Sequence, residues 1–98
     1  MRKIFKKPRA LNDLKDIWGY TSRNWGETQA DNYLQSIEEC LQRLAQSPMI
    51  GKAAYYPKEG LRCYHFQKHI IVYQHNDEII DIVRILHERM DIKRHKLQ

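Results

Sequence analysis

The sequence lacks the features of membrane, secreted and metal-binding proteins. No stretch approaches the ~20 consecutive apolar residues of a membrane-spanning helix, and the N-terminal MRKIFKKPRA carries charge without a signal-peptide apolar core. The two cysteines, Cys40 and Cys63, form no CxxC pair and lie in apolar patterns. We therefore expect a cytoplasmic protein with buried, reduced thiols and no metal site.

The chain is also too short for several kinds of chemistry. Its 98 residues suffice for one two-layer core but leave no room for a cofactor-binding subdomain. Repeats and low-complexity tracts are absent. We expect a single domain over residues 1–98 that uses no cofactor.

What the sequence has in excess is positive charge. The net charge of +5 favours an acidic partner, either nucleic acid or an acidic protein segment, without choosing between them. Lysine and arginine outnumber acids over residues 1–26 and 87–98, whereas residues 27–47 are mainly acidic. The charge is therefore segregated along the chain.

Two segments with helical period follow a short β-prone stretch at residues 2–6. Pro8 suits the first turn of a helix, and Gly26 suits its end. A second pattern covers residues 27–47 and ends before a proline, so the two helices should form an antiparallel hairpin. The apolar face expected on the first helix comprises Leu11, Leu14, Ile17, Trp18, Thr21 and Trp25.

After a turn-rich loop at residues 49–60 the apolar period changes from that of a helix to that of a strand. It predicts strands at residues 61–67, 70–75 and 78–86, with tight turns at Lys68/His69 and Asn76/Asp77. The expected fold is α+β: an N-terminal strand, a two-helix antiparallel hairpin, a three-strand antiparallel meander and a short basic C-terminal tail.

Two amphipathic helices can cover only one face of this sheet. Because Arg62, Tyr64 and Phe66 alternate on one face, they give an arginine flanked by aromatics, which is the composition of an interface anchor. We expect this face to be open and to bind a partner, with Leu61 and Cys63 directed toward the helices.

Five motifs in order resemble the RelE/ParE superfamily of bacterial toxins, and within it the ParE branch. They are DLKDIW.Y after the proline, YL..IE..L..LA..P..G, GLR, H.I.Y and I.RILH.RMD. The resemblance covers nearly the whole chain. It implies a small toxin held inactive by a ParD-like antitoxin in a hetero-oligomer, with DNA gyrase as target and replication arrest as outcome.

RelE relatives instead cleave messenger RNA on the ribosome, so the resemblance leaves a nuclease as the alternative function. RNA cleavage needs cations and an acid or base, for which the chain offers Arg62, Arg84, Tyr73 and His87. The acidic second helix would repel ribosomal phosphate. We therefore favour a protein target and no catalytic residues, with direct nucleic-acid binding an open but less favoured alternative.

The residues expected to contact a protein partner extend from the sheet into the tail. The antitoxin should lay an amphipathic helix on the hairpin and an extended segment along the sheet. His65 and His69 should be exposed histidines rather than zinc ligands, and truncation after Leu86 should cost little core burial. The candidate partner-binding residues are Arg62, Tyr64, Phe66, Tyr73, Arg84, His87, Arg89 and Met90.

Overall fold

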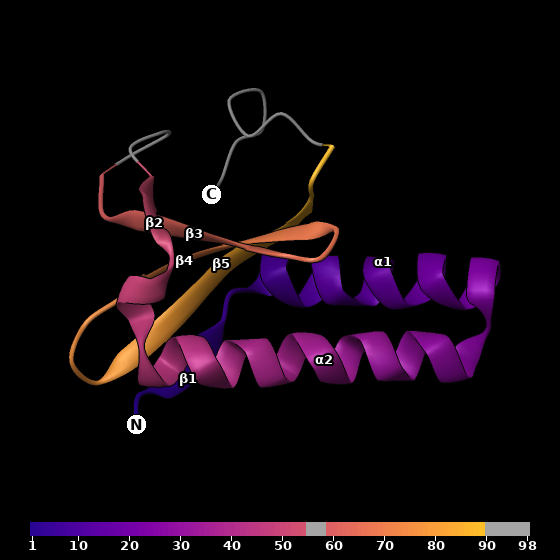
Figure 1. The fold of residues 1–98 in the computed structure, drawn as a ribbon, viewed down its shortest axis with the longest axis horizontal. Helices are drawn as coiled ribbons and strands as arrows, with labels where there is room; N and C mark the ends of the chain where they lie inside the picture. The colour runs from indigo at the N-terminus through magenta and orange to yellow at the C-terminus, as the bar shows by residue number, and fades with distance from the viewer. Residues whose placement is uncertain (55–58, 90–98) are drawn as a thin grey trace.

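The computed structural model describes residues 1–54 and 59–89 and has two helices packed on one face of a five-stranded sheet (Figure 1). This confirms the expected α+β class. The elements in order are β1 (Lys3–Lys6), α1 (Pro8–Trp25), α2 (Glu27–Gln46), the 3-10 turn η1 (Pro48–Ile50), β2 (Lys52–Ala54), β3 (Leu61–Phe66), β4 (His69–His75) and β5 (Ile79–His87).

Pro8 and Gly26 set the limits of the helical hairpin as predicted. Pro8 occupies the first turn of α1, where its missing N–H costs nothing. Gly26 has φ 95°, a left-handed value that glycine adopts easily. Its N–H donates to the Ser22 carbonyl, and its own carbonyl accepts from Ala30 N–H. One glycine therefore ends α1 and begins α2.

The sheet has the order β1-β5-β4-β3-β2. The predicted meander β3-β4-β5 is confirmed, with β1 added parallel to β5 and β2 added antiparallel to β3. The sequence patterns gave no indication of β2. It is only three residues long and lies in the segment predicted as a loop, too short for a two-residue period to be visible.

The helices cover one face of the sheet (Figure 1). Isoleucines and Tyr73 of β4 and β5 meet apolar side chains of both helices there, in one buried cluster. Tyr64 and Phe66 pack against the same cluster. The buried members of this main core are Ala10, Leu14, Ile17, Ile37, Cys40, Leu41, Leu44, Ala45, Ile71, Tyr73, Ile80, Ile82 and Ile85.

The face assignment made from the sequence is therefore wrong. Tyr64 and Phe66 point toward the helices, whereas Leu61 and Cys63 belong to a second cluster with Val72, Val83 and Leu86. The alternation could not reveal this because both faces of the sheet carry apolar residues.

A register shift between β4 and β5 also disturbs the alternation. Val72 pairs with Arg84 while the next residue, Tyr73, pairs with Ile82, so Val83 is the extra residue on β5. A bulge of this kind breaks the two-residue period of the strand. Ile82 and Ile85, three apart, consequently lie in the same core.

The buried stripe of α1 lies to one side of the predicted one. The predicted Leu14, Ile17 and Thr21 are buried, but so is Asp13, which was not predicted. Leu11 and Trp25, both predicted, are exposed by 49% and 60%. The expectation that Trp25 packs in the core is therefore wrong. Neither described helix is long and apolar enough to cross a bilayer.

Candidate functional site

Tyr73 lies at the centre of a buried hydrogen-bonded junction between β4 and η1. Its hydroxyl donates to the Pro48 carbonyl oxygen at 2.6 Å and accepts from Gly51 N–H at 3.1 Å. Burial raises the pKa of Tyr73, and the side chain has no solvent exposure. Both hydrogen-bonding functions of the hydroxyl are thus used inside the protein.

Arg62 fastens the same junction from β3. Its guanidinium Nη2 donates to the carbonyl oxygens of Gly51 and, at 3.2 Å, of Met49. A Cβ at Gly51 would collide with the Tyr73 hydroxyl and lie 2.9 Å from the Cys63 carbonyl oxygen. Only glycine fits at position 51, which is the last residue of the motif YL..IE..L..LA..P..G.

Arg84 is buried and bound to Asp13 of α1. The guanidinium Nε and Nη2 donate to the two carboxylate oxygens at 2.7 and 2.9 Å. The bonds to Asp13 raise the pKa of Arg84. The same carboxylate accepts the Ile85 N–H at 2.9 Å, so it also satisfies the backbone of β5 where β1 has ended.

Sequence reading missed Asp13, although a signal was present. In α1 the buried residues recur with helical spacing, and Asp13 lies three after Ala10 and four before Ile17. An acidic residue at an apolar position of a helix indicates a buried partner, because an unpaired buried carboxylate is costly. Here that partner is Arg84.

Besides the Tyr73 junction and the Arg84–Asp13 pair, a group of polar side chains joins α2 to the start of β4 and the end of β5. The Tyr33 hydroxyl lies 2.6 Å from His69 Nδ1, and the rings of His69 and His87 meet edge to face with centroids 5.4 Å apart. Burial, reinforced by His87, lowers the pKa of His69 from 6.5 to about 4 against the opposite effects of Glu88 and Asp13. His69 is therefore neutral and half-buried, not exposed as predicted.

The four residues of the nuclease alternative do not converge on one accessible centre. Tyr73 is enclosed beneath η1, and Arg62 is bonded to that turn. Arg84 is neutralised by Asp13. His87 stands beside His69, at the end of the β4–β5 pairing farthest from the Tyr73 pair. Two of the four are buried.

The remaining predicted partner-binding residues lie in different surroundings. Tyr64 and Phe66 are half-buried on the helix side, and Phe66 stacks on Tyr33 with ring centroids 6.4 Å apart. Arg89 is exposed, and its N–H donates to His87 Nδ1. Met90 lies outside the described residues.

The basic tail begins later than predicted. His87 is the last residue of β5, and Glu88 N–H donates to the Lys68 carbonyl at 2.8 Å. Glu88 also pairs with His65 at 2.9 Å. Truncation after Leu86 would remove these contacts, although none of the described residues after Leu86 is buried. The expectation that it costs little core burial stays a prediction.

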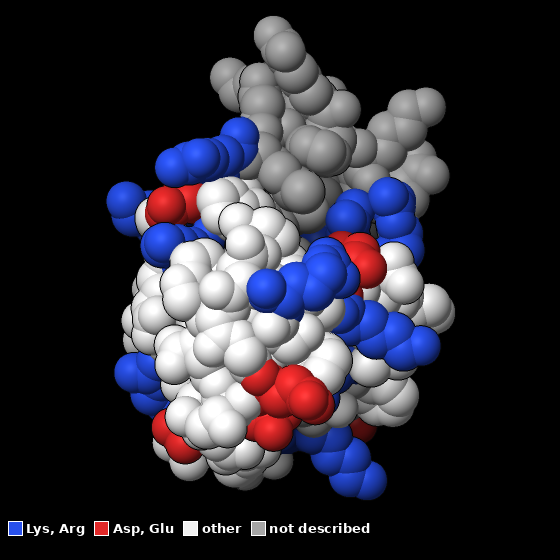
Figure 2. All heavy atoms as spheres, turned by 90° about the vertical axis from the view of Figure 1, so that its right-hand side faces the viewer, with Lys and Arg blue, Asp and Glu red and all other residues white. Residues whose placement is uncertain are grey.

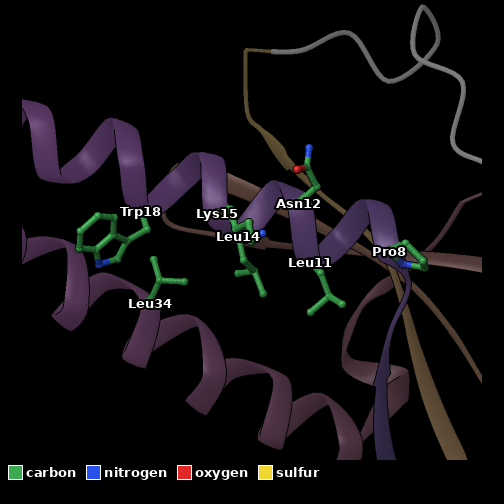
Figure 3. A pocket seen from close by; sticks show the side chains of 7 residues that line it. All are labelled: Pro8, Leu11, Asn12, Leu14, Lys15, Trp18 and Leu34. Atoms are coloured by element: carbon green, nitrogen blue, oxygen red, sulfur yellow. The ribbon is translucent and has the colours of Figure 1, made fainter.

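An apolar groove runs between α1 and α2 on the outer side of the hairpin. Figure 3 shows Leu11, Leu14 and Trp18 of α1 directed toward Leu34 of α2 along this groove. Its volume is about 560 Å³. Leu11 is half exposed although it is a large apolar residue, which marks the groove as a surface suited to an apolar partner.

The described residues contain no group of three or more His, Cys, Asp or Glu side chains placed to hold a metal ion. Both cysteines are free thiols. Cys40 is buried and Cys63 is half-buried, and burial raises the pKa of each. These thiols are therefore poor metal ligands and nucleophiles.

Comparison with known proteins identifies similar sequences over most of the chain. A family model described as the ParE toxin of the type II toxin-antitoxin system parDE matches residues 4–92. The chain is 38% identical over 88 residues to Toxin ParE1 of Mycobacterium tuberculosis, a match covering 89% of this chain and 90% of that protein. It is 34% identical over 83 residues to Toxin ParE of Escherichia coli, covering 82% and 79% of the two chains.

Solved structures share the fold at lower identity. A chain of the chromosomal ParDE system of Pseudomonas aeruginosa superposes with a TM-score of 0.76 at 21% identity, over 89% of this chain and 96% of that one. A chain of the RelBE2 toxin-antitoxin complex of Mycobacterium tuberculosis gives 0.67 at 17% identity, over 88% and 96%. Both matches concern the fold alone.

Proposed function

Because the chain belongs to the ParE toxin family of type II toxin-antitoxin systems, we propose that it inhibits DNA gyrase and that a ParD-like antitoxin neutralises it. The action is that of a protein ligand on its target in the cytoplasm, without catalytic residues or cofactor. The fold does not decide this point, since the similar RelBE2 structure has the same architecture.

The observation that carries the proposal is that the side chains of Tyr73 and Arg84 are both hydrogen-bonded to other groups of the protein. A general acid or base must reach the proton that it transfers, and the Tyr73 hydroxyl is enclosed between Pro48 and Gly51. A cation that stabilises a phosphorane must be free to face it, whereas Arg84 is buried and its Nε and Nη2 are bonded to the Asp13 carboxylate. Both groups support the structure instead.

The surface of α2 also supports a protein target over the ribosome. Glu27, Asp31 and Glu39 are exposed on this helix. Asp31 accepts a hydrogen bond from Trp18 Nε1 at 2.8 Å, and Glu38 pairs with Lys6 at 2.6 Å. An acidic helix repels the phosphates of ribosomal RNA, whereas it attracts a protein surface that carries basic groups.

The groove between α1 and α2 is the proposed antitoxin site. Its lining is apolar, with Leu11, Leu14 and Leu34 beside Trp18, which fits the apolar face of an amphipathic helix. Arg62 offers a second contact, because its side chain is partly exposed where Nη2 meets the Met49 carbonyl. An antitoxin carboxylate could pair with the exposed part of this guanidinium.

Expression in cells tests the proposed target. The free toxin should relax plasmid DNA or leave it broken while messenger RNA remains intact, and co-expression of the cognate antitoxin should abolish the effect. Cleaved messenger RNA with normal supercoiling would support the nuclease instead. Normal growth during confirmed soluble expression would show that the chain is not a toxin.

A further inference from the structure

A second cavity lies at the end of the molecule where the tip of the helical hairpin faces the β3–β4 turn. It is formed by the end of α1, the start of α2, the turn at Gln67 and Lys68, and the end of β5, and has a volume of about 290 Å³. Figure 2 looks onto this end of the molecule, and Figure 1 shows it from the side, at the right. The groove of Figure 3 is separate: the two cavities share no lining residue.

Two exposed aromatic rings form one wall of this end cavity. Tyr20 and Trp25 are 56% and 60% exposed. Their ring centroids are 6.0 Å apart with an angle of 63° between the planes. Neither ring belongs to the core, and two adjacent exposed aromatic rings form an accessible apolar surface with polar edges. This wall therefore offers a ligand two aromatic surfaces.

The rest of the lining is polar. Gln29 and Gln67 offer amide donors and acceptors, and His69 and His87 offer ring nitrogens. Among the described residues that line the end cavity, none has an aliphatic side chain, whereas leucines line the hairpin groove. Aromatic faces combined with hydrogen-bonding edges match a flat heterocycle better than the apolar side chain of a protein partner.

Cationic side chains stand at the rim. Lys68 and Arg89 line the end cavity, and within the described residues neither makes an ion pair. The one acidic residue of the lining, Glu88, is paired with His65. Figure 2 shows a largely uncharged area on this end, with lysine and arginine side chains around it and acidic side chains both above and below.

We propose that the end cavity binds one unpaired base of a single-stranded nucleic acid, with the flanking phosphates against Lys68 and Arg89. The base stacks on Trp25 or Tyr20, and the glutamines and histidines contact its edge. Single-strand binding commonly combines such stacking with a cationic path for the backbone. The volume, near the lower end of the ~300–1,000 Å³ of ligand pockets, admits one base and not a duplex.

The test measures binding of the purified chain to fluorescently labelled oligothymidylate, oligouridylate and a duplex of equal length. Both single strands should bind more tightly than the duplex, and preference between them assigns DNA or RNA as the source of the base. Trp25→Ala should weaken single-strand binding by about fivefold or more, since stacking on an aromatic ring is worth ~1–3 kcal/mol per base. Lys68→Ala should weaken it and flatten its salt dependence.

Leu11→Ala is the matched control, because Leu11 is similarly exposed but lies in the hairpin groove. It should bind oligonucleotides like the unmodified chain, and thermal melting should show that all variants fold. Equal binding of duplex and single strands, or unchanged binding by Trp25→Ala, would overturn the proposal. So would a Trp25→Ala variant that loses antitoxin or gyrase binding but keeps oligonucleotide binding, which would assign the cavity to a protein.

Discussion

At the scale of single residues, the polar groups that most resemble a catalytic set stabilise the fold. Tyr73 and Arg62 fix η1 to the sheet, and Arg84 joins β5 to Asp13 of α1. Each of these contacts joins two different elements of the fold, and those of Tyr73 and Arg84 are buried, so their loss should lower stability. Residue types alone could not distinguish this role from catalysis, because the same side chains serve both.

Tyr73→Phe tests the buried junction. Removing the hydroxyl leaves Gly51 N–H and the Pro48 carbonyl without their partner, which should lower the free energy of unfolding by ~1–3 kcal/mol. Urea denaturation measures the change. Tyr20→Phe is the matched control on an exposed ring and should have almost no effect. Equal stability of the two variants would show that the hydroxyl does not hold η1.

Asp13→Asn tests the buried ion pair. The amide keeps the shape of the carboxylate but leaves the charge of Arg84 uncompensated, so the free energy of unfolding should fall by ~3–5 kcal/mol. Asp16→Asn, on an exposed position of the same helix, should change it by less than ~0.5 kcal/mol. A small loss of stability in Asp13→Asn would mean that the Arg84 side chain can reach solvent and is available to a partner.

His69 predicts a pH dependence of stability. Its pKa is lowered from 6.5 to about 4 in the folded protein, mainly by burial. The unfolded chain therefore binds more protons between these values, so the contribution of His69 is complete above about pH 6.5 and is lost as pH falls toward 4. His69→Gln should flatten that part of the stability curve.

The control for this measurement is Gln67→Asn, since Gln67 is exposed in the turn before His69, carries no titrating group and has a positive φ that asparagine tolerates. It should keep the slope of the unmodified chain between these pH values. Parallel curves for His69→Gln and the unmodified chain would contradict a neutral, half-buried His69.

At the scale of elements, apolar periodicity predicted both helices and the three meander strands to within about two residues. It failed where the period is short or broken: β2 has three residues, and the bulge at Val83 interrupts β5. The faces of the sheet could not be assigned because two apolar clusters lie on opposite sides. Helical spacing could have placed Asp13 in the buried face of α1, but it could not have identified Arg84 as its partner.

The hairpin groove leads to a prediction about the two helices. Leu11→Glu places a charge in the groove and should weaken antitoxin binding by tenfold or more, because a buried unpaired charge costs several kcal/mol. Folding should be little affected, since Leu11 is 49% exposed. Calorimetry with the antitoxin measures the affinity.

Phe5→Glu is the matched control, because Phe5 is also an exposed apolar residue but lies on the edge strand β1, outside the groove and at the opposite side of the sheet from β3 and Arg62. This variant should bind the antitoxin with nearly the affinity of the unmodified chain. Unchanged affinity of Leu11→Glu, or equal losses for both variants, would show that the antitoxin helix does not occupy this groove.

At the scale of the whole molecule, the family and fold are established, whereas gyrase as the target is our proposal. RelBE2 and ParDE structures both superpose on it. What favours gyrase over RNA here is the engagement of Tyr73 and Arg84 and the acidic surface of α2. The sequence predicted the family from ordered motifs, but the state of these side chains required the structure.

The most direct measurement adds the purified toxin to a gyrase supercoiling reaction and, in parallel, to a translation reaction programmed with a defined messenger RNA. We expect gyrase to lose supercoiling activity and the messenger RNA to remain uncut, and the antitoxin should restore supercoiling. Cut messenger RNA with unaffected supercoiling would contradict the central claim and assign this chain to the nucleases of the superfamily.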